Sequence, residues 1–423
     1  MKIGIDFGTT NSSVAVARGG VVEMASFSSL AGMSESFRSV LYLELVKQAG
    51  GMSSVKSWGG NQAIDQYLEA ETKGRLIQSL KSFLSSRMFQ KTEILRRMYT
   101  LEDLIARMLR EVREQAEKQF GVPIRSVIAG RPVRFVGSNS DDDDKFAMSR
   151  LEGAYLQAGF EAVRFEMEPV GAAQFYESRL DHDELILIGD FGGGTSDFSL
   201  LRVGPGIRKR GRRSKDLLGN AGLGLAGDTF DARIIRQLVS PELGAGTQIN
   251  SMGKILPTPN WVYAKLERWH QLSFLRTRET LNMLESVRAQ SSDPEKIEAL
   301  LHIVNEDLGY QLHRAVQKTK CELSVSETAR FHFTDGTVEI DSMVTRADFE
   351  KWIGEELRSI ETCVDSLLER SGVQRKDIDM VFLTGGSSFV PAVRKIFSDR
   401  FGDERIQAGN EFTSVARGLA LIP

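Results

Sequence analysis

A strand-turn-strand unit rich in glycine and hydroxyl residues occurs twice in this chain, once at the start and once in the middle. The first copy reads Ile3-Gly4-Ile5-Asp6-Phe7-Gly8-Thr9-Thr10-Asn11-Ser12, and the second reads Leu187-Ile188-Gly189-Asp190-Phe191-Gly192-Gly193-Gly194-Thr195-Ser196-Asp197. In each copy a short apolar run ends in aspartate, and a second strand-like run follows the turn directly. Both halves of the chain are therefore expected to build the same kind of turn.

Such a turn suits a phosphate ligand. Glycine lacks a Cβ atom, so the backbone can approach a ligand closely, and consecutive N–H groups form an anion-binding nest. The aspartate at the strand end would repel phosphate, so we expect it to hold Mg²⁺ that the phosphates also contact. One copy alone is equally typical of an ordinary hairpin turn. Two copies favour a pair of turns that clamp a polyphosphate from both sides.

Composition limits the class of protein. At 423 residues the chain is too long for one compact core, so two domains or lobes are expected. The net charge of −3 argues against nucleic-acid binding, and no apolar run has the length of a membrane span. Two cysteines, Cys321 and Cys363, and a first strand that begins at the N-terminus without a signal peptide favour a cytoplasmic protein.

Several elements can be predicted from residue spacing. Apolar residues at helical intervals predict a helix over Leu101–Phe120, and Thr345-Arg346-Ala347-Asp348 predicts a capping box at another helix start. The glycine- and serine-rich segment 49–60 is expected to be a loop. Residues 75–84 are expected to form a loop followed by a helix.

Three other features have competing interpretations. The basic stretch 208–215 is either a surface for an acidic partner or a solvated hairpin tip, and we favour the hairpin tip. Residues 222–227 match G-x-G-x-x-G, but a basic polar stretch precedes them, so we reject a dinucleotide fold and expect a helix entry with Asp228 as N-cap. Trp261 and Trp269 are expected in the core of a helical bundle rather than on a partner surface.

Four segments, in this order, resemble the nucleotide-binding domain of the 70-kDa heat-shock chaperone family, within the actin-like ATPase superfamily. They are the two turns described above, Ala226-Gly227-Asp228-Thr229-Phe230-Asp231, and a third glycine-hydroxyl turn, Thr384-Gly385-Gly386-Ser387-Ser388, which a helix opened by Pro391 follows. The resemblance extends over essentially the whole chain.

The resemblance implies an α/β fold with a duplicated ribonuclease-H-like core and two lobes around a nucleotide cleft. Lobe I would comprise residues 1–184 with an inserted subdomain at about 35–115. Lobe II would comprise residues 185–423, with a mostly helical insertion at about 232–315 and a last helix at 414–421.

The resemblance also implies roles for five charged residues. Asp6 and Asp190 would face each other across the cleft and hold Mg²⁺ largely through water, with Asp197 as a further carboxylate near the metal and a K⁺ site. Glu168 would position water and metal, and Lys81 would reach the γ-phosphate and the attacking water. These five residues form the predicted catalytic set for phosphoryl transfer.

Other residues would contact the nucleotide, either ATP or ADP. The phosphates would be lined by Gly8, Thr9, Thr10, Asn11, Gly192, Gly193, Gly194 and Thr195. The remaining nucleotide contacts would come from Gly227, Asp228, Gln317, Lys320, Gly385, Gly386, Ser387 and Phe389.

The sequence departs from the family pattern at the expected base site. Gln317 and Cys321 replace charged residues of the base-clamping helix, and Phe389 and Phe412 replace an arginine and an acidic residue. The family continues into a peptide-binding domain where this sequence ends, so we expect a chain that acts without its own peptide-binding domain.

These features predict an Mg²⁺-dependent ATPase of low turnover, whose nucleotide state is read by an unidentified, co-chaperone-like protein partner. The alternative is a nucleotide sensor that binds ATP or ADP without hydrolysis. A small-molecule kinase and a filament-forming protein are further alternatives, since the superfamily contains both.

Overall fold

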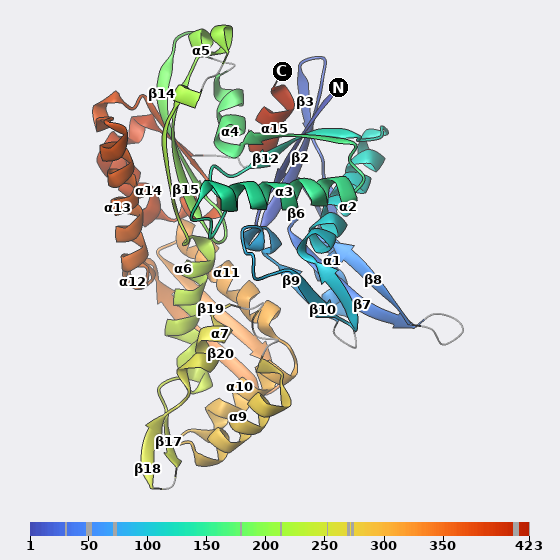
Figure 1. Cartoon of the computed structure of the whole chain (residues 1–423). Coiled ribbons are helices and arrows are strands. Elements are labelled where there is room, and N and C mark those ends of the chain that lie inside the picture. The colour runs from blue at the N-terminus through green and yellow to red at the C-terminus, as the bar shows by residue number, and fades with distance from the viewer. Residues whose placement is uncertain are drawn as a thin grey trace. The chain divides into compact units, whose positions relative to one another are not determined.

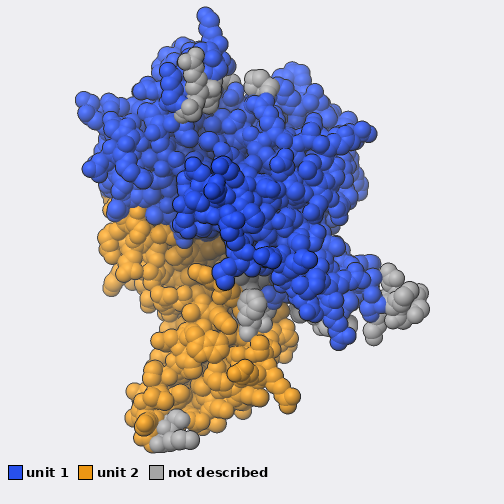
Figure 2. Space-filling model, viewed as in Figure 1, with its two compact units in different colours: residues 1–224, 362–388, 397–423 blue, residues 225–361, 389–396 orange. Residues whose placement is uncertain are grey.

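The computed structural model describes residues 1–29, 32–47, 53–70, 74–177, 180–211, 214–251, 253–268, 271, 275–408 and 414–422 (Figure 1). The chain divides into two compact units, and each buries its own apolar residues (Figure 2). Unit 1 comprises residues 1–224, 362–388 and 397–423, and unit 2 comprises residues 225–361 and 389–396.

The first sheet of unit 1 has the strand order β13-β12-β1-β2-β3, and β6 joins it beside β2. β1, β2 and β3 form an antiparallel meander, whereas β12 and β13 run parallel to β1. The strands are β1 (Lys2–Phe7), β2 (Asn11–Arg18), β3 (Val21–Met24), β6 (Phe37–Arg38), β12 (Ser126–Arg131) and β13 (Ala162–Met167).

The second sheet of unit 1 has the order β16-β15-β14-β21-β22. Its first three strands again form an antiparallel meander, and β21 and β22 run parallel to β14. The strands are β14 (Glu184–Phe191), β15 (Ser196–Val203), β16 (Leu217–Leu223), β21 (Met380–Thr384) and β22 (Ile406–Ala408). The two sheets share one topology, which confirms the duplicated α/β core.

The major helices repeat in the same order around the two sheets. Around the first sheet, α2 (Leu101–Phe120) precedes β12, α3 (Asp141–Gln157) follows β12, and α4 (Glu168–Glu177) follows β13. Around the second sheet, α13 (Gly354–Ser371) precedes β21, α14 (Pro391–Phe401) follows β21, and α15 (Ser414–Leu421) follows β22. Thr100 and Asp103 cap α2 reciprocally, and its apolar face joins the core of the first sheet, as the spacing predicts.

The helices α4 and α15 exchange sheets. α4 follows the first sheet but packs Val170 and Ala173 against apolar residues of the second. α15 follows the second sheet but packs Ala416 and Ala420 against the first. The two helices also lie directly against each other (Figure 1).

The contact between these helices depends on glycine. A Cβ atom on Gly418 would lie 1.8 Å from the carbonyl oxygen of Gly171, and one on Gly4 would lie 2.2 Å from that of Ala416. Side chains at these positions would force the helices and β1 apart. Glu168 and Pro169 open α4, so this helix packs closely against α15 near its first turn.

The rest of unit 1 consists of short insertions and connections. β7 pairs on opposite sides with β8 and β9, and β4 pairs with β5 and β10 with β11. These elements are β4 (Phe27–Ser29), β5 (Gly32–Ser34), β7 (Val40–Lys47), β8 (Ser53–Gly59), α1 (Gly60–Glu69), β9 (Arg75–Gln78), η1 (Leu80–Phe83), β10 (Lys91–Ile94), β11 (Arg97–Thr100), α5 (Pro205–Arg210), η2 (Ser214–Asp216), η6 (Arg375–Asp377), η7 (Gly386–Phe389, whose last residue belongs to unit 2) and η8 (Asp403–Arg405).

Unit 2 is mostly helical and contains two hairpins, β17–β18 and β19–β20. Thr345 accepts a hydrogen bond from the backbone N–H of Asp348, which confirms the predicted helix start. The elements are α6 (Gly227–Ile234), η3 (Ile235–Val239), η4 (Ser240–Leu243), β17 (Gln248–Ser251), β18 (Lys254–Pro257), α7 (Asn260–Leu266), α9 (Arg278–Gln290), α10 (Pro294–Asn305), α11 (Gly309–Val325), β19 (Thr328–Asp335), β20 (Val338–Thr345) and α12 (Arg346–Trp352).

Two segments of unit 1 that are predicted to be loops form β-strands instead. Residues 53–59 form β8, because their backbone pairs with β7 along its length and this pairing overrides a glycine- and serine-rich composition. Residues 75–78 form β9 for the same reason, and the expected helix after them is the short η1. Residues 49–52 of the predicted loop lie outside the described part of the chain.

The basic stretch lies in the connection between the antiparallel neighbours β15 and β16, as the preferred interpretation predicts, but this connection is more than a simple turn. Pro205 opens the short helix α5, since its fixed φ suits a first helical turn, and Ile207 is buried beneath it. Arg210 pairs with the buried Asp216, whereas Arg208 and Lys209 are exposed. Arg212 and Arg213 lie outside the described residues.

Two predictions for unit 2 are also wrong. Trp261 is 45% exposed, because α7 turns Val262 and Leu266 inward and leaves the indole under the ammonium of Lys265. Asp228 lies in the first turn of α6, so Ala226 is the N-cap residue. Trp269 and Phe412 lie outside the described residues.

Residues 222–227 do not build a dinucleotide-binding unit. Gly222 lies within β16, an edge strand that runs antiparallel to β15, whereas that fold needs a parallel βαβ unit.

Among the described helices, none is long and apolar enough to cross a membrane.

Replacing Gly418 with alanine tests the helix contact. The added Cβ would strike the Gly171 carbonyl, so we expect Gly418→Ala to lower the free energy of unfolding by roughly 2–4 kcal/mol in urea denaturation. Gly153→Ala in α3 is the matched control, because its Cβ would meet no atom within 4 Å. The control should keep or slightly raise the stability. Equal stability of Gly418→Ala and wild type would contradict the packing argument.

Candidate functional site

Three glycine-hydroxyl turns lie at strand ends within unit 1. The first joins β1 to β2, where a Cβ atom on Gly8 would lie 2.1 Å from the carbonyl oxygen of Asn11. The second joins β14 to β15, and the N–H of Gly192 donates to the carbonyl of Thr195. Gly193 and Gly194 complete this turn. Thr9 and Thr10 complete the first.

The third turn follows β21. Gly385 has a φ of +90°, and a Cβ atom there would lie 1.9 Å from the carbonyl oxygen of Phe191, so the turn packs directly against the end of β14. The Ser388 hydroxyl donates to the Gly385 carbonyl over 2.7 Å and closes the turn. Gly386 and Ser387 lie in η7, which this turn opens.

A buried ion pair lies beside these turns. Lys81 Nζ and Glu168 Oε1 are 2.7 Å apart, and the two side chains are only 8% and 16% exposed. Lys81 comes from η1 and Glu168 is the first residue of α4, so residues 87 positions apart in the sequence meet here. The pair brings together two residues that the sequence predicts for one site.

Carboxylates surround the ion pair. Asp6 is the penultimate residue of β1 and lies opposite Ser13, while Asp190 and Asp197 are cross-strand neighbours on β14 and β15. Burial, with the negative charges of Glu168 and Asp190, raises the pKa of Asp6 to about 8 although Lys81 opposes this. Burial and the charge of Asp190 raise the pKa of Asp197 to about 7.

Burial and the neighbouring charges also shift the pKa values of Asp190 and Lys81. Burial and the charge of Glu168 raise the pKa of Asp190. Burial disfavours the charged form of Lys81, but Glu168 and Asp6 outweigh it and raise the pKa of the lysine. One ammonium group thus balances several carboxylates, and the excess of negative charge favours binding of a cation.

The structure adds a residue to this group, Thr384. Its hydroxyl donates to Asp190 Oδ1 over 2.9 Å and opposes the rise in the pKa of Asp190. β21 runs parallel to β14 in a register that places Thr384 opposite Asp190. The sequence shows Thr384 only as the start of the third turn, because the pairing of these two strands is not visible in it.

A small cavity in unit 1 lies beside these residues. Its wall includes Glu168, Asp190, Asp197 and Thr384, together with Pro132 and Val133 from the segment after β12. Pro169 and Ala172 of α4 and Val415 of α15 also line it, so the two exchanged helices form part of the cavity wall.

A family model described as "Hsp70 protein" matches residues 46–253 and 295–423 of the chain. The chain belongs to the Hsp70 family. It is 25% identical over 430 residues to chaperone protein DnaK of Thermus thermophilus, and this match covers 99% of the chain and 60% of that protein. It is 24% identical over 442 residues to chaperone protein dnaK of Cyanidioschyzon merolae, with 99% and 61% covered. The chain thus spans about 60% of the length of these curated relatives.

Membership of the Hsp70 family confirms the resemblance and the actin-like ATPase fold. The carboxylate set fits the Mg²⁺ of that family, because Mg²⁺ prefers oxygen ligands and keeps several waters. Among the described residues, no three of the Asp6, Glu168, Asp190 and Asp197 carboxylates approach within 4.8 Å of one another.

The predicted base-side residues of this Hsp70-family chain belong mostly to unit 2. Lys320 on α11 pairs with Asp231 Oδ1 at 2.7 Å and donates to the Gly227 carbonyl at 3.1 Å, which ties α11 to α6. Gln317 lies one turn earlier on α11, Asp228 is exposed and Phe389 is 49% exposed. Their roles toward a nucleotide stay predictions.

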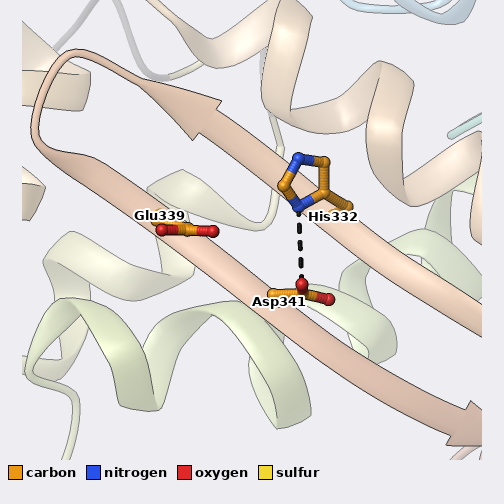
Figure 3. A group of neighbouring side chains, drawn as sticks. All are labelled: His332, Glu339 and Asp341. Atoms are coloured by element: carbon orange, nitrogen blue, oxygen red, sulfur yellow. Dashed lines mark ion pairs between the residues drawn. The ribbon is translucent and has the colours of Figure 1, made fainter.

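A second group of metal-ligand types lies on the β19–β20 hairpin. His332, Glu339 and Asp341 point from the two strands to one face (Figure 3), and all three are exposed. Asp341 already accepts two hydrogen bonds from the guanidinium of Arg330. A cation would have to displace this arginine, so the group is a weaker candidate for metal binding than the carboxylates of unit 1.

The raised pKa of Asp197 makes stability depend on pH. Between the unfolded value of 3.8 and the folded value of about 7, the folded protein holds a proton that the unfolded chain releases. The free energy of unfolding therefore falls as pH rises through this interval. Asn resembles the neutral acid, so Asp197→Asn should stabilise the metal-free protein at pH 8 by about 1–3 kcal/mol and change little near pH 4.5.

Urea unfolding in EDTA at these two pH values measures this difference. The exposed Asp403→Asn is the control and should follow wild type at both. Saturating Mg²⁺ should reduce the advantage of Asp197→Asn at pH 8. An Asp197→Asn protein that loses stability with rising pH as steeply as wild type would show that this carboxyl is not the titrating group.

Proposed function

We propose that this chain binds ATP or ADP with Mg²⁺ at the three turns of unit 1 and hydrolyses ATP slowly, as a chaperone-type ATPase domain. The observation that carries the proposal is the Lys81–Glu168 ion pair, 2.7 Å apart and set among Asp6, Asp190 and Asp197 beside a cavity. Membership of the Hsp70 family supports the same activity, because the curated relatives are named as chaperones.

The turns would bind the phosphates through their backbone. Gly8 to Asn11 and Gly193 to Thr195 would offer backbone N–H groups and hydroxyls to a phosphate, and the glycines leave room for its close approach. These donors are fixed before the nucleotide arrives, so little reorganisation is needed as charge moves during phosphoryl transfer.

Each charged residue of the site would have a separate role in binding Mg²⁺, the terminal phosphoryl group or the attacking water. The ammonium of Lys81 would neutralise charge on the terminal phosphoryl group, and the Glu168 carboxylate would orient the attacking water. Asp6, Asp190 and Asp197 would hold the waters of a bound Mg²⁺, which would supply further positive charge at the phosphates. Thr384 would keep the Asp190 carboxylate oriented through its hydrogen bond. We also propose that K⁺ binds near Asp197.

The conformation of the chain would depend on the bound nucleotide, and a protein partner would recognise this conformation. The family relation supports this role, because the relatives are named as chaperones. The exposed side chains of Arg208 and Lys209 are one available contact for such a partner. The partner's identity does not follow from the chain's own residues.

A nucleotide sensor without hydrolysis is the alternative. The changed base-side residues motivate it, since Gln317 is uncharged and Phe389 stands where the family pattern has an arginine. This alternative keeps nucleotide binding and lacks phosphate release, so one assay separates the two functions.

Single-turnover release of phosphate from ATP, with Mg²⁺ and K⁺, tests the proposal. Wild type should release phosphate slowly, and Lys81→Ala and Asp190→Ala should each lower the rate by roughly a hundredfold, as loss of a charge-stabilising group does. Lys145→Ala, an exposed lysine of α3, is the control and should retain the wild-type rate.

Calorimetric titration with ATP accompanies the assay. ATP binding without release in wild type would favour the sensor. Release that persists in Lys81→Ala and Asp190→Ala would exclude the proposed centre even if the chain is an ATPase.

A further inference from the structure

An arginine lies beside the first glycine-hydroxyl turn without belonging to any of the motifs. Arg38 is the second residue of the short strand β6, which pairs with the start of β2 so that Asn11 lies opposite Arg38 and Ser12 opposite Phe37. The backbone N–H of Ser39 donates to the carbonyl of Thr10 over 2.8 Å. β6 is thus bonded directly to the turn that holds Thr10 and Asn11.

The position of Arg38 is fixed from the opposite face of this strand pair. Phe37 is buried in the core of the first sheet, and the hydroxyls of Ser12 and Ser39 lie 2.9 Å apart in a buried hydrogen bond. Side chains alternate along a strand, and directly paired residues share a face. Arg38 therefore lies on the other face, together with Asn11, where the turn is partly exposed.

The guanidinium is oriented by the turn itself. Arg38 Nη1 donates to Asn11 Oδ1 over 3.1 Å. In the described part of the chain no carboxylate lies within ion-pair distance of Arg38, whereas Lys81, the other cation assigned to the phosphates, is paired with Glu168. The charge of Arg38 is thus uncompensated beside an anion-binding turn, and most of its N–H donors are free for a ligand.

We propose that Arg38 binds a phosphate oxygen of the nucleotide, as a further specificity-determining residue of the site. This inference rests on the proposed function, because it assigns Arg38 to the same polyphosphate ligand. A guanidinium suits this role, since it stays charged and its planar N–H groups match the oxygens of a phosphate. The site therefore prefers nucleotides with a polyphosphate chain over nucleosides, and part of that preference comes from Arg38.

Calorimetric titration with Mg·ATP and with adenosine tests this role in wild type, Arg38→Gln and Arg38→Lys. Arg38→Gln removes the charge and should weaken ATP binding by roughly tenfold or more, the usual effect of losing a charge-assisted hydrogen bond. Adenosine binding should not change. Arg38→Lys keeps the charge but loses the planar fork, so its affinity for ATP should be intermediate.

Arg18→Gln is the matched control. Arg18 ends the same strand, β2, and donates to the Phe120 carbonyl away from the turn, so this variant should bind ATP like wild type. Thermal melting without ligand separates binding from folding: a purely structural role of Arg38 would lower the melting temperature of Arg38→Gln and weaken ATP and adenosine equally, which would overturn the inference.

The remaining outcomes distinguish the two proposals. Wild-type affinity for ATP in Arg38→Gln would overturn the role of Arg38 and leave the nucleotide site intact. A wild-type protein that binds neither ATP nor adenosine would overturn the proposed function, and the inference about Arg38 would fall with it.

Discussion

The close packing of α4 against α15 holds unit 1 together. Each helix continues from one sheet and packs on the other, so the pair joins the two halves of the duplicated core. This exchange requires backbones in direct contact, and Gly171, Gly418 and Gly4 provide it because none of them carries a Cβ atom. Glu168 is the first residue of α4, so the packing that joins the sheets also positions a central residue of the site.

The electrostatics of the site follow from that packing. Glu168, Asp190 and Asp197 line one cavity, and Asp6 lies near enough for the charges of Glu168 and Asp190 to shift its pKa. Burial and mutual repulsion raise the pKa of Asp6, Asp190 and Asp197, and the charge of Lys81 opposes this rise. Such a concentration of carboxylates is unfavourable for a fold without a ligand and favourable for a site that binds a metal and polyphosphate.

The positive groups near the site are held in different ways. Lys81 is nearly buried and paired with Glu168, so its position is fixed by an ion pair. Arg38 is partly exposed, and its guanidinium is held by a hydrogen bond to the side-chain amide oxygen of Asn11. In the proposed site, the buried Lys81 would act in catalysis and the more exposed Arg38 would bind phosphate.

Local sequence is enough to predict the repeated strand-turn-strand unit, whose two copies the structure places at the start of the two sheets of unit 1. Glycine, aspartate and hydroxyl residues at fixed spacing specify a strand end and a tight turn, because this chemistry is local and repeats in both halves of the chain. Lys81 and Glu168 could be assigned to one site only through the family resemblance, since nothing local links residues so far apart, and their ion pair is not predicted. The lobe boundaries at residues 184 and 185 and the base contacts of Gln317, Lys320 and Phe389 stay predictions.

Other features depend on contacts that form only in the folded chain. β8 and β9 form because β7 offers them a hydrogen-bonding partner, whatever their glycine and serine content. Trp261 is exposed because α7 buries its other face, a choice that depends on neighbouring elements. Thr384 meets Asp190, and Arg38 meets Asn11, through strand pairings between distant segments. Local composition does not encode such pairings, because their free energy comes from partners that folding brings together.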